Sequence, residues 1–98
     1  MGLLERFLPR IEFDSYEDFK ENYRVNPPEK FNFGFDIVDA WAKEDKEKRA
    51  LVWCDDHGQE KVITFDEMSR LSNQAANYFK SLGLTRDSVV MLIMRRRW

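Results

Sequence analysis

The sequence predicts a mixed α/β fold with N-terminal helices, a β-hairpin, a long amphipathic helix and one core strand. Three neighbouring patterns support this prediction. Two strand-like segments flank a turn at residues 55–60, a helical pattern follows at 63–84, and a continuous apolar run comes next at 88–94. The last run lacks polar alternation, which is typical of a strand covered on both faces in a parallel or mixed sheet.

The long helix is expected over residues 63–84, where both ends carry capping signals. Thr64 and Glu67 stand three residues apart, as in a capping box, and Gly83 followed by Leu84 suits a Schellman motif. Apolar residues recur at spacings of three and four, so they share one face that should pack in the core. That face comprises Met68, Leu71, Ala75, Tyr78, Phe79 and Leu82, and the polar face comprises Arg70, Asn73, Gln74, Asn77 and Lys80.

Two shorter helical segments are expected near the N-terminus. The first is a single turn that Pro9 ends, interpreted as an arm packed on the protein body, with a weak membrane-surface anchor as the alternative. The second spans residues 15–25, is capped by Asp14 or Ser15, and stops before the prolines that follow. The apolar face of the turn comprises Leu3, Leu4, Phe7 and Leu8, and that of the helix Tyr16, Phe19 and Tyr23.

A third helix and the hairpin complete the expected elements. The helix follows the proline-containing linker and frays over residues 43–49 into a charged, solvated segment. Residues 50–54 and 61–65 then pair as a hairpin across a turn that contains glycine and acids. The apolar face of the third helix comprises Phe33, Ile37, Val38, Trp41 and Ala42.

Composition excludes several classes of function. The chain has 98 residues and a net charge of −2 from 16 basic and 18 acidic residues, so no overall field recruits nucleic acid or an anionic membrane. Cys54 is the only cysteine, which excludes an internal disulfide and indicates a reducing compartment, with the cytoplasm as the default. No stretch approaches the ~20 apolar residues of a membrane span.

Three groups of side chains are candidates for chemistry, and each has a simpler structural interpretation. Cys54 and His57 would make a nucleophile pair, but a thiol in an apolar strand is ordinarily buried and inert. The acids around His57 would ligate a cation, although their spacing matches no EF-hand or zinc motif. The guanidinium groups of an arginine run would bind a phosphate, although a basic run at the end of a strand is the simpler interpretation. The acids are Asp55, Asp56 and Glu60, and the basic run is Arg95, Arg96 and Arg97 beside Trp98.

No phosphate-binding loop, dinucleotide fingerprint, zinc-protease motif or nucleophile elbow occurs in the sequence. We therefore expect no catalytic, cofactor-binding or metal-binding residue in this chain.

From Phe31 onward the sequence resembles the opening of an AMP-forming acyl-CoA synthetase, closest to the medium-chain and acetyl-CoA-synthetase-like branch of the adenylate-forming enzymes. Three pieces carry the resemblance in order: FNFGFDIVD, ALVWCDDHGQEKVITFDEMSRLSNQAANYFKSLGL and DSVVMLIMRRRW. The earlier FDSYEDFKENYRVNPPEKFN is similar to the leader of that branch. The resemblance implies a helical leader over residues 1–30 and, over 31–98, the truncated start of the large AMP-binding domain.

The resemblance also implies the chemistry of a parent enzyme. Such an acid–thiol ligase of fatty acid metabolism uses ATP, Mg²⁺ and CoA to convert a carboxylic acid into an acyl-adenylate and then a thioester. Its phosphate loop, acyl pocket and catalytic lysine would lie beyond Trp98, so this segment is expected to be an inactive scaffold whose partner is the rest of the enzyme. Self-association is also expected, because the apolar strand lacks cover. The alternatives are a stand-alone protein-interaction module and a non-functional remnant.

Overall fold

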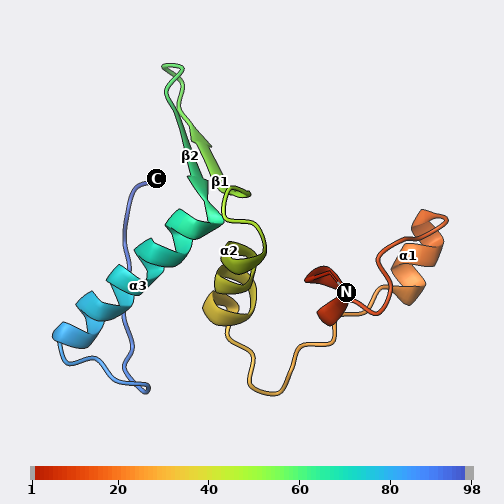
Figure 1. Ribbon diagram of the computed structural model, residues 1–98, viewed down its shortest axis with the longest axis horizontal. Coiled ribbons are helices and arrows are strands. Elements are labelled where there is room, and N and C mark those ends of the chain that lie inside the picture. Colours follow the sequence, from red (N-terminus) through yellow and green to blue (C-terminus); the bar gives the residue numbers. More distant parts are fainter. Residues whose placement is uncertain (1, 97–98) are drawn as a thin grey trace.

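The computed structural model describes residues 2–96 and has the predicted mixed α/β class (Figure 1). A one-turn 3-10 helix and a π-helical segment accompany three α-helices and two strands. In chain order the elements are η1 (Leu4–Arg6), α1 (Tyr16–Asn22), η2 (Gly34–Asp39), α2 (Ala40–Glu44), β1 (Arg49–Cys54), β2 (Glu60–Thr64) and α3 (Phe65–Ser81).

Helix α3 begins and ends as the sequence predicts. The Oγ1 atom of Thr64 accepts a hydrogen bond from the Glu67 N–H at 3.2 Å, and the Thr64 N–H donates to Oε2 of Glu67 at 2.9 Å. At the other end Gly83 has a φ of +82°, which favours glycine, and the Leu84 N–H donates to the Phe79 carbonyl at 3.2 Å. The capping box and the Schellman motif are therefore both confirmed.

Strands β1 and β2 form an antiparallel two-stranded sheet, which confirms the predicted hairpin. Leu51 stands opposite Ile63 and Val52 opposite Val62. An irregularity between Arg49 and Leu51 interrupts the pairing at the start of β1. Among the described residues each strand has one neighbour only, so both outer edges of the hairpin are open.

The core lies where η2 and α2 pack against the first turns of α3. The Trp41 and Phe65 rings lie 5.9 Å apart between centroids. The hydroxyl of Ser69 donates a hydrogen bond of 2.6 Å to Oδ1 of Asp39, which ties α3 to η2. The buried apolar residues of this region are Val38, Ala42 and Ile63.

The N-terminal turn packs on the chain itself. Leu3 and Phe7 are buried, and the Phe7 ring meets that of Phe31 edge-on at 5.7 Å. The Asn26 N–H also donates to the Phe7 carbonyl at 2.7 Å. These contacts favour the packed arm over the membrane-surface anchor.

Two predicted helices have different bounds in the structure. Helix α1 ends at Asn22 instead of reaching residue 25, because Tyr23 is already extended (φ −64°, ψ 124°) ahead of the prolines. Ser15, not Asp14, is the N-cap, since its hydroxyl accepts from the Asp18 N–H at 3.1 Å. The third predicted helix consists of η2 and α2 in series.

The predicted core strand at 88–94 is not formed. These residues have no regular secondary structure, and no backbone group of 89–94 makes a backbone hydrogen bond within the described part of the chain. Val89, Met91 and Ile93 are 94%, 84% and 88% exposed. A strand requires a neighbouring strand, and none of the described segments pairs with this one.

The predicted core face of α3 is likewise mostly uncovered. Leu71, Tyr78 and Leu82 are 48%, 61% and 59% exposed. Phe65 and Ser69, through which α3 contacts α2 and η2, lie on a different side of the helix at about 100° per residue. The expectation that this face is buried is therefore wrong for the described chain.

The molecule is much less compact than its length allows. Its radius of gyration is 17.2 Å, whereas a domain of about 100 residues usually has about 13 Å. Its accessible surface is 8985 Å², against about 5900 Å² for a folded monomer of 11.8 kDa. Figure 1 shows the reason, because α1, the hairpin and α3 project in different directions.

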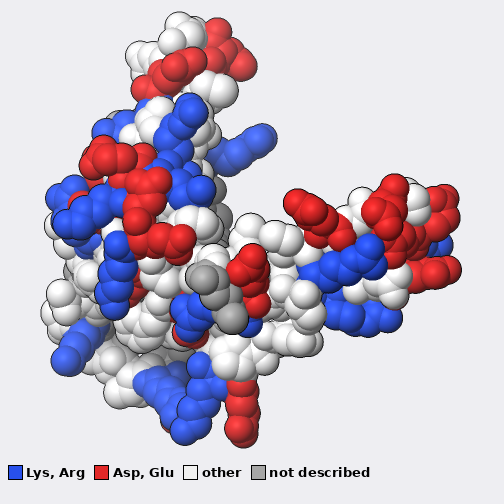
Figure 2. Space-filling model, turned by 45° about the vertical axis from the view of Figure 1, so that its right-hand side comes forward, with Lys and Arg blue, Asp and Glu red and all other residues white. Residues whose placement is uncertain are grey.

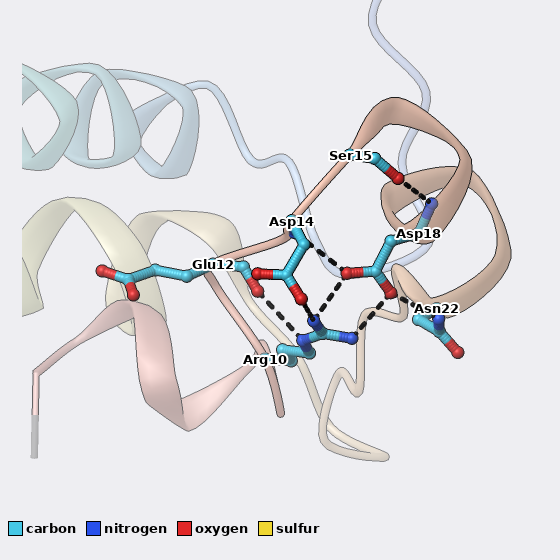
Figure 3. A network of polar contacts seen from close by, with 6 residues as sticks. All are labelled: Arg10, Glu12, Asp14, Ser15, Asp18 and Asn22. Atoms are coloured by element: carbon cyan, nitrogen blue, oxygen red, sulfur yellow. Dashed lines mark hydrogen bonds and ion pairs between the residues drawn. The ribbon is translucent and has the colours of Figure 1, made fainter.

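A polar network centred on Asp18 holds the projecting α1 (Figure 3). The Arg10 guanidinium donates to both carboxylate oxygens of Asp18 at 2.8 and 2.6 Å. The Asp14 N–H and the Asn22 amide donate to the same carboxylate at 3.0 and 2.7 Å. The hydrogen bond from the Asp14 N–H, followed by those from Arg10 and Asn22, lowers the pKa of Asp18 below its usual value.

We expect this network to loosen in acid. Its bonds favour the ionised carboxylate, so the stabilisation is present above the pKa of Asp18 in the unfolded chain, about 3.9, and is lost as pH falls through the lower folded-state pKa. Amide protection factors in α1, measured by NMR, should fall over that range. Asp18→Asn should lower them already at neutral pH, whereas Glu17→Gln should not. Equal protection in both variants would contradict this role for Asp18.

Candidate functional site

The acidic turn of the hairpin is built around Asp55. Its Oδ1 atom accepts hydrogen bonds from the N–H groups of His57 at 2.9 Å and Gln59 at 2.8 Å. Gly58 has a φ of +79°, a conformation that side chains disfavour. The Asp55 carboxylate therefore shapes the turn, which explains why an acid precedes the glycine here.

The structure gives no support to a nucleophile pair or a metal site in this turn. Cys54 ends β1 opposite Glu60, and its thiol is exposed, so the expectation of a buried thiol is wrong. His57 takes part in the turn through its backbone N–H, which donates to Oδ1 of Asp55. Among residues 2–96 no group of three or more His, Cys, Asp or Glu side chains is arranged to hold a metal ion.

Arg96 lies beside the acidic turn. It lines an open hollow of about 630 Å³ together with Val52, Trp53, Cys54, Asp55 and Asp56. Two carboxylates in the same hollow oppose a bound phosphate, because like charges repel at these distances. Arg97 and Trp98, the other members of the predicted basic run, lie outside the described residues.

Charge is mixed on the face of the molecule that Figure 2 shows. In Figure 2 acidic and basic side chains are interspersed on the face shown, with acids at the hairpin tip and along the projecting arm. This distribution agrees with the near-balanced composition and gives that face no continuous basic stripe of the kind that nucleic acids require.

The candidate functional surfaces are therefore apolar. We call Leu71, Tyr78 and Leu82 the open helix face, and residues 89–94 the open segment. At the N-terminal end of the open helix face, Leu71 lines a hollow of about 220 Å³. The Thr64 N–H and the nearby cations Lys61 and Arg70 lower the pKa of the Glu67 carboxyl at its rim. The lining residues are Lys61, Ile63, Glu67, Arg70, Leu71 and Gln74.

Sequence reasoning missed one apolar hollow of about 270 Å³ near the N-terminus. Residues from η1, the proline-containing linker and η2 line it, so no single periodic pattern could have indicated it. The lining residues are Leu4, Phe7, Leu8, Tyr23, Val25, Pro27, Phe31, Phe33 and Ile37.

Comparison with known proteins assigns the chain to a family. The family model described as AMP-binding enzyme matches residues 38–98, which is more than half of the chain. The chain belongs to the AMP-binding enzyme family. This result confirms the resemblance to AMP-forming acyl-CoA synthetases.

Three relatives within this family illustrate the similarity. Acyl-coenzyme A synthetase ACSM3, mitochondrial, of Mus musculus is 33% identical over 88 residues, which cover 84% of this chain and 15% of the relative. The human (Homo sapiens) ACSM2A synthetase is 37% identical over 75 residues, covering 70% and 13%. The human ACSM4 synthetase is 34% identical over 87 residues, covering 81% and 15%. This member of the family thus spans about 15% of the length of the relatives it matches.

The comparisons also correct one expectation. These relatives are named as mitochondrial proteins, which overturns the cytoplasmic location inferred from the single cysteine. Cysteine usage separates oxidising from reducing compartments and carries no further information about location. Among the described residues, no helix has the length and apolar character needed to cross a membrane.

Proposed function

We propose that this chain is a scaffold portion of an acyl-CoA synthetase and makes no catalytic contribution of its own. The observation that carries the proposal is the open helix face within a segment that belongs to the AMP-binding enzyme family. An amphipathic helix with its apolar face in water is unfavourable, at roughly 25 cal/mol per Å² of exposed apolar surface. Covering Leu71, Tyr78 and Leu82 with the rest of the synthetase would remove that cost.

We further propose the organisation of the segment. Residues 1–30 form a helical leader, and 31–98 begin the adenylate-forming domain, in which α3 packs on a sheet and the open segment becomes one of its strands. The family match supports this division, since it starts at residue 38 and includes both α3 and the open segment. The surface excess over a compact monomer, about 3000 Å², supports the need for such cover.

The reaction proposed for the whole enzyme is that of the named relatives, which are acyl-coenzyme A synthetases. ATP and a carboxylic acid would give an acyl-adenylate and pyrophosphate, and CoA would then displace AMP to form the thioester. Two observations on the described residues support sites for these ligands elsewhere in the enzyme: no group of three or more His, Cys, Asp or Glu side chains is arranged to hold a metal ion, and Arg96 shares its hollow with Asp55 and Asp56. We therefore assign ATP, Mg²⁺ and CoA to parts of the enzyme outside this segment.

Calorimetric titration tests the absence of a nucleotide site. The purified 98-residue chain should give no saturable heat with ATP and Mg²⁺, and none with CoA. Saturable binding of either ligand would contradict a purely structural role. In that case Arg95→Ala and Arg96→Ala would be compared with Arg86→Ala, an exposed arginine outside the basic run.

A chimera tests the scaffold role directly. The segment of the mouse ACSM3 synthetase that aligns with this chain would be replaced by this chain, with the unmodified mouse enzyme as the control. We expect the chimera to form acyl-CoA thioester and the isolated chain to form neither thioester nor AMP. A folded but inactive chimera would contradict the proposal, and so would thioester formation by the isolated chain. If the chain were instead a stand-alone interaction module, we would expect the folded but inactive chimera.

A further inference from the structure

We draw no further inference here: the strongest candidate, the apolar hollow that η1, the proline-containing linker and η2 line near the N-terminus, carries nothing, because nothing in the described part of the structure shows what covers it.

Discussion

Ile63→Ala should lower the free energy of unfolding of the chain by about 2–5 kcal/mol, the range for truncating a buried isoleucine. Ile63 is 5% exposed and is the buried residue of β2, immediately before the cap of α3. Few side chains are buried in this chain, so each one carries a large share of its marginal stability. Urea denaturation followed by circular dichroism at 222 nm would give the free energies of unfolding of the unaltered chain and of the variant.

Val62→Ala is the matched control. Val62 is the adjacent residue of β2, points to the other face of the strand and is 40% exposed. Its truncation also removes a β-branched side chain from the hairpin, but without leaving a cavity, so the expected cost is about 1 kcal/mol or less. If Val62→Ala cost as much as Ile63→Ala, the core would not lie on the face of the hairpin to which Ile63 points.

Features that depend on neighbours in the sequence were predictable. The caps of α3 need only Thr64 with Glu67 at one end and Gly83 at the other, and each of these acts within four residues. The hairpin is equally local, because its register follows from a short turn that Asp55 closes. The residues that specify these elements are neighbours in the sequence, so the pattern indicates the elements without reference to what packs against them.

Burial was not predictable from the same patterns. The spacing of Leu71, Tyr78 and Leu82 correctly indicates a shared apolar face, but periodicity does not identify what covers that face. The apolar run at 88–94 has the composition of a core strand, yet a strand forms only with a neighbour. Both expectations failed because they depend on polypeptide that does not pack against these residues in the described chain.

The candidate site shows the same difference between features set by neighbouring residues and features set by distant ones. The turn role of Asp55 is a local effect, and a residue type suited to turns already indicated it. The meeting of Arg96 with the acidic turn joins residues about 40 positions apart, and no pattern in the sequence indicates that proximity. The family assignment, by contrast, rests on the ordered string as a whole and needs no single residue.

Leu71→Asp should be tolerated in the isolated chain but strongly destabilising in the mouse chimera. In the isolated chain Leu71 is 48% exposed, so the carboxylate stays hydrated and unfolding free energy should change by about 1 kcal/mol or less. In the chimera the proposed packing would bury that carboxylate without a partner, at a cost of several kcal/mol. The chimera should therefore lose its thermal stability and its thioester formation.

Asn73→Asp introduces the same side chain two residues away, on the exposed polar face of α3. It should be tolerated in both contexts, which controls for the added charge and for the helix propensity of aspartate. If Leu71→Asp were also silent in the chimera, the open helix face would not be a packing surface of the synthetase. If Leu71→Asp were strongly destabilising already in the isolated chain, Leu71 would have to be buried there, which its exposed fraction contradicts. Only a penalty that appears when the rest of the enzyme is present agrees with a scaffold whose apolar face is completed by that enzyme.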